Sequence, residues 1–518
     1  MKRPAAKLPD PLQDIPACLF LRHITPNIGI VFSLGHVPSE NSVVAGDIGL
    51  TGMSACEVVD LLNGGEVTPL DCLDALEVRI AAVENVVNAL PILCFDRARD
   101  RARRLLQQPL GRRGRLAGLP VPIKDLTDVS DVRSTYGSTI FADHVPEQSD
   151  ILVERLEAEG GVVYAKSNTP EFGAGGNTFN DVFGTTLNPW NTDLSAAGSS
   201  GGAAVALATG MAWVAQGSDL GGSLRNPASF CGVVGLRPSP GRVPRSARFK
   251  IDDLLSVNGP MARNVEDTAL LLDAMTGDSP ADPLSLPRTE SFLAAARSGW
   301  RPARVAFSAD LGITPVDPEV ASICRAAAAS LAAIGTHVEE AHPDLSEAHD
   351  TFSVLRGMAF AISYGALLEP HRDKMKPEVV WNIEKGLSYS MADIVRAENN
   401  RAAIYRRMYA FFETYDLLLC PATIVAAYPA SDRYVKECAG YAFPNYFEWL
   451  AIAYAISLTA APALSLPCGF TKDGRPVGLQ IVGRTRAEGQ VLAAARALEL
   501  LLDLHPPTPI DPRPRRHV

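Results

Sequence analysis

The sequence predicts an α/β fold that forms one large domain after about residue 50. Its 518 residues are 47% apolar, which is enough to bury a sizeable core. In the middle of the chain, short β-rich runs at 119–123 and 162–166 alternate with helical segments such as 150–159. We see no internal repeat and no clear linker after residue 50, so a single domain over residues 49–505 is preferred to two.

The N-terminal part of the expected domain is helical. Residues 1–48 carry repeated prolines without sustained periodicity, which predicts an irregular leader. Ser54 and Glu57 match a capping box at the start of a first helix. Thr68-Pro69 opens a second helix, and an arginine-rich third helix is expected over 97–106.

The later elements follow from composition and periodicity. Residues 197–210 are expected to form a Gly/Ser loop that leads into a helix of very small side chains. The remaining expected elements are helices over 317–335 and 391–414, strands over 416–420, 463–467 and 477–482, and a Pro/Arg-rich tail over 506–518.

Charge and cysteine usage restrict the partners. Lys and Arg number 48 against 58 Asp and Glu, and the resulting net charge of −10 argues against nucleic acid or an anionic membrane as a partner. A small-molecule substrate is favoured instead. The nine cysteines show no C-x-x-C pair, and we find neither a cleavage signal nor an apolar stretch of about 20 residues, so we expect a cytoplasmic protein without a membrane segment. Many chains of this length pair, which makes a homodimer a reasonable expectation.

Metal and nucleotide motifs are missing from the sequence. The histidines show no H-E-x-x-H pattern, and the cluster at 337–349 lacks metal-ligand spacing. No Gly-Lys dipeptide exists for a phosphate-binding loop, and Gly173, Gly175 and Thr178 break the dinucleotide fingerprint at its third glycine. We therefore expect no metal and no cofactor.

One string match is misleading. Residues 198–202 read G-x-S-x-G, the nucleophile elbow of α/β-hydrolases. An elbow requires an apolar strand directly before the serine, whereas residues 188–195 are polar and turn-like. The context therefore argues against this assignment.

Lys124 is a stronger candidate for chemistry. It lies in the apolar run Val121-Pro-Ile-Lys124, where a solvated ammonium group is out of place. The structural alternative is an ion pair with Asp125. The functional alternative is a lysine of depressed pKa that acts as the general base for a serine.

Three segments together resemble a known family. Lys124 in GLPVPIKD, the run AGSSGGAAVALATG from Ala197, and QGSDLGGSLRNPASFCGVVGLRPS from Gln216 closely resemble the amidase signature family of serine hydrolases. The 24-residue spacing between Ser199 and Ser223 agrees with the family, and the resemblance extends over about residues 50–500. It implies the amidase signature fold, with a large mixed, twisted β-sheet covered by helices on both faces.

The resemblance also implies roles for single residues. Lys124 corresponds to the base, Ser199 to a bridging serine after a cis peptide bond, and Ser223 to the nucleophile. Taken alone, Ser199 and Ser223 could equally be a loop-capping hydroxyl and a turn residue. The implied oxyanion-hole donors are the backbone N–H groups of Leu220, Gly221, Gly222 and Ser223, and the implied supporting residues are Ser200, Asp219 and Arg225.

Two details of the resemblance concern the neighbouring loops. Ala197 stands where the family usually has glycine, and we expect only a minor backbone adjustment there. The acyl pocket is expected to be lined by Gly173, Gly175, Asn177 and Tyr136. Cys231 and the aromatic residues over 441–449 are further candidates, although core packing explains each of them separately.

The resulting functional hypothesis is an amidohydrolase that cleaves a carboxamide C–N bond through an acyl-enzyme. Aryl amides, cyclic amides, carbamates (urethanes) and esters are further candidate substrates. Two alternatives stay open. One is the glutaminase subunit of a tRNA-dependent amidotransferase, and the other is a non-catalytic binding protein on the same fold.

Overall fold

The structure is a computed structural model, and it describes residues 49–246, 251–504 and 508–514. The predicted leader over 1–48 lies outside the described residues, as do residues 506–507 and 515–518 of the predicted tail.

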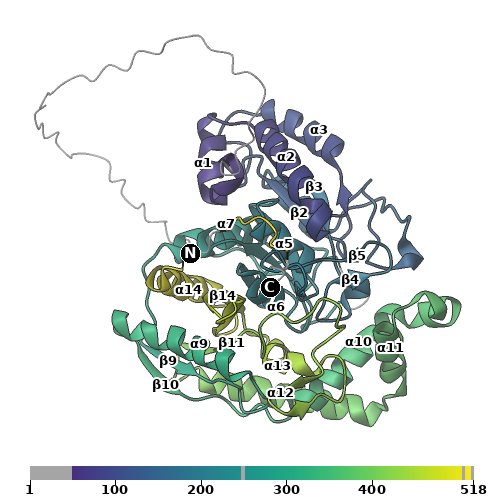
Figure 1. The fold of residues 1–518 in the computed structure, drawn as a ribbon, viewed down its shortest axis with the longest axis vertical. Coiled ribbons are helices and arrows are strands. Elements are labelled where there is room, and N and C mark those ends of the chain that lie inside the picture. Colours follow the sequence, from purple (N-terminus) through teal and green to yellow (C-terminus); the bar gives the residue numbers. More distant parts are fainter. Residues whose placement is uncertain (1–48, 247–250, 505–507, 515–518) are drawn as a thin grey trace, which may run out of the picture. The chain divides into compact units, whose positions relative to one another are not determined.

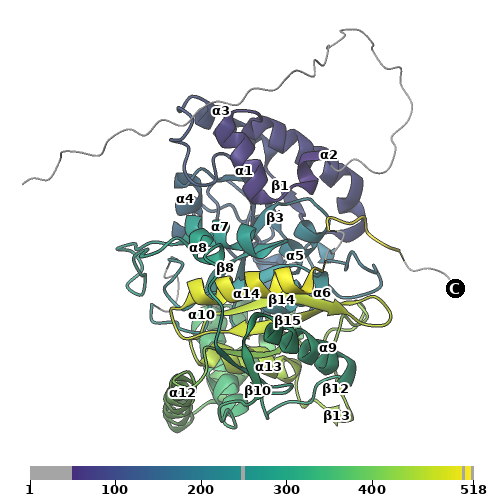
Figure 2. The same ribbon diagram turned by 90° about the vertical axis from the view of Figure 1, so that its left-hand side faces the viewer.

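A mixed eight-stranded sheet organises the described residues (Figures 1 and 2). In spatial order its strands are β10 (His337–Glu340), β9 (Arg304–Phe307), β11 (Leu417–Pro421), β15 (Pro476–Val482), β14 (Ala463–Phe470), β7 (Val234–Arg237), β8 (Val257–Ala262) and β6 (Val214–Asp219). Strand β9 is parallel to both of its neighbours, and the other pairs are antiparallel.

Smaller sheets complete the strand inventory. A three-stranded sheet has the order β1 (Ile92–Leu93), β3 (Val162–Ser167) and β2 (Pro120–Lys124), with β2 parallel to β3. The two-stranded sheets pair β4 (Phe179–Asn180) with β5 (Gly184–Thr185) and β12 (Glu437–Cys438) with β13 (Tyr441–Ala442). Strand β2 lies against β6, which brings the end of the small sheet to the edge of the large one.

The helices pack around these sheets. They are α1 (Ala55–Gly64), α2 (Pro69–Val87), α3 (Phe95–Leu106), α4 (Ile151–Ala158), α5 (Gly201–Ala208), α6 (Arg225–Cys231), α7 (Val265–Met275), α8 (Phe292–Ala296), α9 (Pro318–Ala329), α10 (Ala348–His371), α11 (Pro377–Ser388), α12 (Met391–Phe411), α13 (Ala451–Leu458) and α14 (Glu488–Leu502). The predicted capping box of Ser54 and Glu57 is present in α1, and Thr68 caps α2. The predicted helix over 317–335 ends earlier, because its last turn tightens into a 3-10 helix over Ser330–Ile334.

Alternation along β11 shows how both faces of the large sheet are buried. Leu417 and Leu419 join the hydrophobic cluster that also holds residues of α9 and α14. Leu418 and Cys420 join the cluster that holds residues of α10, α12 and α13. Because successive strand residues point to opposite faces, the continuous apolar run gives a strand with helices on both sides, as expected.

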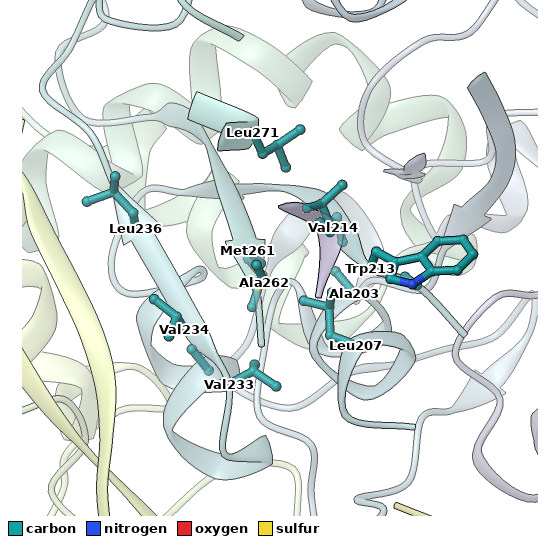
Figure 3. Packing of buried hydrophobic residues seen from close by; sticks show 14 of the residues in the cluster. Ala203, Leu207, Trp213, Val214, Val233, Val234, Leu236, Met261, Ala262 and Leu271 are labelled. Carbon is teal, nitrogen blue, oxygen red and sulfur yellow. The ribbon is translucent and has the colours of Figure 1, made fainter. Parts of the chain in front are cut away.

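Helix α5 carries the predicted small side chains into the core. Figure 3 shows Ala203 and Leu207 beside Val214 at the start of β6 and Ala262 of β8. Gly202 lies so close to the neighbouring backbone that an added Cβ would stand 2.3 Å from the amide nitrogen of Asn168. The small residues therefore let α5 sit deep enough to present its first turn beside β2 and β6.

Helix α10 is a long apolar helix. Within the described residues, Ala348–Lys374 is the one helix long and apolar enough to cross a membrane by length and composition, which a search for an uninterrupted apolar stretch does not detect. In the fold this helix packs against α11, α12 and α13. Its apolar character therefore has a packing explanation.

Candidate active site

Lys124 ends strand β2 and is completely buried. Its Nζ atom is within hydrogen-bond distance of three hydroxyl oxygens, at 2.7 Å from Ser199, 2.8 Å from Ser200 and 3.1 Å from Ser218. Helix α5 begins directly after Ser200 and β6 carries Ser218, so three separate elements meet at this amine. The structure therefore brings the predicted base and two predicted serines together.

Burial changes the acidity of this amine. It lowers the pKa of Lys124 from 10.5 to about 7, because the charged form loses its hydration and the negative charge of Asp219 compensates only in part. A substantial fraction of Lys124 is therefore neutral at neutral pH. A neutral amine has the lone pair that a general base requires.

The structural alternative for Lys124 is wrong. Asp125, the proposed ion-pair partner, instead lies 3.4 Å from Lys166 Nζ and accepts hydrogen bonds from the backbone and hydroxyl of Thr135. Asp125 follows the last residue of β2, and its carboxylate faces Lys166 instead of Lys124.

The segment before α5 has the geometry implied by the resemblance. The peptide bond between Gly198 and Ser199 is cis. Ala197 has a φ of +56°, in the left-handed region that glycine adopts most easily, so the backbone keeps this conformation with alanine in place.

Ser223 lies in the tight loop that joins β6 to α6 and is partly exposed. Its carbonyl oxygen accepts a hydrogen bond of 3.2 Å from the backbone N–H of Ser200, which ties this loop to the start of α5. Gly222 has a φ of +115°, and an added Cβ would lie 2.7 Å from the Cβ of Ala453. Both conformation and space therefore require glycine beside the serine.

A buried ion cluster supports this loop. The Asp219 carboxylate contacts the Arg225 guanidinium at 3.0 and 2.9 Å, and Arg237 lies 3.2 Å away. Burial alone would raise the pKa of the Asp219 carboxyl, but the two guanidiniums hold it below its usual range. Asp219 therefore stays charged, and Arg225 fixes the start of α6 against it.

The backbone N–H groups around Ser223 are not equivalent. Asp219 accepts the N–H of Gly222 at 2.9 Å, so this donor is already in use. The N–H groups of Leu220, Gly221 and Ser223 have no acceptor among the described residues. Of the four predicted oxyanion donors, these three are therefore available to a ligand.

A cavity of about 560 Å³ opens over Ser199, Ser218 and Ser223. The predicted pocket residues Gly173 and Tyr136 line it. Four other aromatic side chains share the lining, namely Phe141, Phe172, Phe360 and Tyr364. The cavity therefore combines the serines with several aromatic side chains, as a site for a small organic ligand would.

The other two predicted pocket residues do not line this cavity. The Asn177 amide nitrogen donates to carbonyl oxygens of Ala430 and Asp432, and its oxygen accepts from Ser195. Gly175 lies on the same stretch of backbone. These hydrogen bonds engage Asn177 in holding two loops together, so the structure places it outside the lining of this cavity.

The further candidates also lie elsewhere. Cys231 is buried, with its thiol directed at the carbonyl oxygen of Ala196. The aromatic residues over 441–449 belong mainly to the hydrophobic cluster that also holds residues of α10, α12 and α13. Core packing accounts for them. Among the described residues, no cluster of three His, Cys, Asp or Glu side chains is placed to bind a metal ion.

Comparison with known proteins decides the family. The family model described as Amidase matches residues 71–492. The chain belongs to the amidase signature family. It is therefore a hydrolase of the amidase class, whose reactions are at amide carbon–nitrogen bonds.

The similar proteins include amidases and amidotransferase subunits. An acylamidase from Rhodococcus erythropolis is 35% identical over 455 residues, which cover 86% of this chain and 95% of the relative. The A subunit of a glutamyl-tRNA(Gln) amidotransferase from Moorella thermoacetica is 35% identical over 489 residues, which cover 88% and 97%. A solved bacterial aryl acylamidase of the same family superposes with a TM-score of 0.81 at 26% identity, covering 88% of this chain and 96% of its own, and this confirms the predicted fold.

Sequence reasoning missed two parts of the amidase site. The first is Ser218, whose hydroxyl contacts the Lys124 amine. It directly precedes the predicted supporting residue Asp219 on β6, and strand alternation could have placed it on the same side as Gln216. Helix α10 supplies a cavity wall from more than a hundred residues downstream, and no local pattern marks that contact.

Proposed function

We propose that this amidase is a serine hydrolase in which Ser223 is the nucleophile, Ser199 the relay and Lys124 the base. The observation that carries the proposal is the 2.7 Å distance between Lys124 Nζ and Ser199 Oγ in a site where burial brings the pKa of the lysine to about 7. A lysine in this state can accept a proton at neutral pH without histidine.

The reaction proceeds by acyl transfer. Ser223 Oγ attacks the amide carbonyl carbon, its proton passes to Ser199 Oγ, and the proton of Ser199 passes to Lys124 Nζ. The tetrahedral intermediate then collapses, the C–N bond breaks, and the leaving nitrogen takes a proton back along the same path. Water attacks the resulting ester in a second round and releases the acid.

The loop around Ser223 stabilises the developing negative charge. The N–H groups of Leu220, Gly221 and Ser223 donate to the oxyanion, while Gly222 uses its N–H to hold the loop on Asp219. Ser200 and Ser218 hold the lysine amine in position, and Arg225 keeps Asp219 ionised. Losing one oxyanion donor typically costs about 3–4 kcal/mol of transition-state stabilisation.

The substrate of the proposed reaction is a small-molecule amide, and the likeness to acylamidases favours acyl amides and anilides. Carbamates and esters share the carbonyl chemistry and belong to the same proposal. We further propose that the protein works in the cytoplasm, on the basis of its cysteine pattern, and without nucleic acid, since its net charge is −10.

A glutaminase subunit is the second candidate, because the likeness to an amidotransferase A subunit is as strong in identity as that to the acylamidase. It predicts glutamine hydrolysis that appears only when partner subunits are added. Turnover of anilides or carbamates by the isolated chain favours the free-standing hydrolase.

The test is hydrolysis of a panel of primary amides, anilides, carbamates and esters by the wild type, Ser223→Ala and the control Ser346→Ala. Ser346 is exposed and does not line the cavity. We expect Ser223→Ala to lose about 10⁴-fold or more in kcat and the control to match the wild type. Normal hydrolysis by purified Ser223→Ala contradicts the assignment, and failure of a fluorophosphonate probe to label the wild type supports a non-catalytic binding protein.

A further inference from the structure

Helix α10 forms one wall of the active-site cavity with a single face. The cavity residues Arg356, Phe360, Ser363 and Leu367 follow helical spacing along it. Arg356 is charged, and the other three side chains are uncharged. The one charged group on this wall therefore has a defined place in the cavity.

The other charged residues that line the cavity have protein partners. Arg245 pairs with Asp253 at 3.2 Å. Asp150 caps helix α4 and also accepts the backbone N–H of Ser246. Arg356 is only 7% exposed, and no carboxylate of the described residues forms an ion pair with it. A buried guanidinium without a counter-charge is costly unless something else supplies one.

Neutral contacts hold the Arg356 guanidinium in place. Its Nε donates to Asn382 at 3.2 Å, and one terminal nitrogen, Nη2, donates to the Tyr446 hydroxyl at 2.8 Å. The ring of Phe360 lies 4.8 Å from its central carbon. The other terminal nitrogen, Nη1, has no acceptor among the described residues. The group is thus fixed in orientation with donors left over.

The guanidinium lies close to the reacting centre. Its central carbon is 6.0 Å from the ring of Phe352, one turn earlier on α10. That ring touches the oxyanion loop, since a Cβ added to Gly221 would lie 2.9 Å from its Cζ atom. Arg356 and Ser223 also line the same cavity, so a substrate whose carbonyl oxygen occupies this loop can extend toward the guanidinium.

We propose that Arg356 binds a carboxylate of the substrate, so that the preferred substrates are amides that carry an acidic group near the scissile bond. This inference rests on the proposed hydrolase function. A planar guanidinium with free donors matches a carboxylate in both shape and charge. The substrate then supplies the counter-charge that the protein lacks.

Two matched pairs of substrates test the proposal. On the acyl side, glutaric acid mono-4-nitroanilide is compared with the 4-nitroanilide of 5-methylhexanoic acid, in which an isopropyl group replaces the carboxylate. On the amine side, 4-acetamidobenzoate is compared with 4-isopropylacetanilide. We expect the wild type to prefer the anionic member of at least one pair by about 10- to 100-fold in kcat/KM.

Variants of Arg356 provide the second arm. We expect Arg356→Gln to reduce that preference at least tenfold, chiefly through KM for the anionic substrate, and Arg356→Lys to keep part of it. Equal rates within both pairs for the wild type, or a preference that survives Arg356→Gln, overturn the proposal. If turnover depends on Ser223 but is equally fast for the anionic and the neutral substrate of each pair, only this inference fails. If no compound is turned over, protection of Ser223 from a fluorophosphonate by glutarate in the wild type supports it, and no protection overturns it.

Discussion

Two buried lysines on neighbouring parallel strands show how partners decide what a side chain does. Lys124 on β2 and Lys166 on β3 are both fully buried. Lys166 Nζ donates to the Thr127 carbonyl at 2.7 Å and the Ser134 hydroxyl at 2.6 Å, and it lies 3.4 Å from the Asp125 carboxylate. Among the described residues, the amine of Lys124 contacts three hydroxyls and no carboxylate.

The difference fits a structural role for Lys166 and the proposed reactive role for Lys124. Burial lowers the pKa of Lys166, but the negative charge of Asp125 opposes the shift. For Lys124 the opposing charge of Asp219 is more remote, and the pKa falls to about 7. Burial is common to both side chains, so the adjacent counter-charge is what differs.

Replacing the two lysines by methionine should have opposite consequences. Lys124→Met removes the proposed base, so we expect kcat to fall about 10³- to 10⁴-fold, near the upper range for general-base catalysis. Its Tm at pH 7 should match or exceed that of the wild type by about 2–4 °C, because no amine has to be buried. Kinetics and thermal unfolding of one preparation check both expectations.

The Tm difference between Lys124→Met and the wild type should depend on pH. The folded-state pKa of Lys124, about 7, lies below its unfolded value of 10.5. Between these values the unfolded chain binds more protons, so the wild type gains stability as pH rises. The Tm difference between Lys124→Met and the wild type should therefore shrink from pH 7 to 10, and a constant difference contradicts the assigned pKa.

Lys166→Met should lower the stability of the fold much more than it lowers kcat. It leaves Asp125 buried without its counter-charge, which typically costs about 3–5 kcal/mol of stability. We expect a clear fall in Tm, with kcat per folded molecule changed less than tenfold. Active-site titration with a fluorophosphonate counts the folded molecules. A stable Lys166→Met protein that has lost activity would reverse the roles assigned to the two lysines.

The wild-type rate should rise with pH through about 7. Below that pH Lys124 carries a proton and cannot accept another, so the active fraction grows as the proton is lost. A profile of kcat/KM between pH 5 and 9 on a neutral anilide measures this. An acid optimum is incompatible with a lysine base.

The smallest expected effect is at the hydroxyls around the amine. Ser200→Ala removes one hydrogen-bond partner of Lys124, worth about 1 kcal/mol, so we expect about a fivefold fall in kcat/KM. Ser218→Ala, at the longer distance of 3.1 Å, should cost no more. A loss as large as that of Lys124→Met would show that one of these serines, rather than Ser199, relays the proton.

The sequence predicted those features that local patterns encode. Capping residues such as Ser54 located helix starts, and the resemblance of the segments around Lys124, Ser199 and Ser223 to the amidase signature family indicated the candidate site. It could not predict that Asp125 would form an ion pair with Lys166, because that contact depends on how strands β2 and β3 pair. Nor could it show that the Asn177 side chain donates hydrogen bonds to a loop some 250 residues later in the chain.

Covalent labelling tests the central claim most directly. The wild type is treated with a fluorophosphonate across pH 5–9, and the modified residue is located by peptide mass spectrometry. We predict one adduct, on Ser223, with a labelling rate that is half-maximal near pH 7 and falls at least 10³-fold in Lys124→Met. An adduct on Ser199, or a rate that is unaffected by Lys124→Met, would contradict the account.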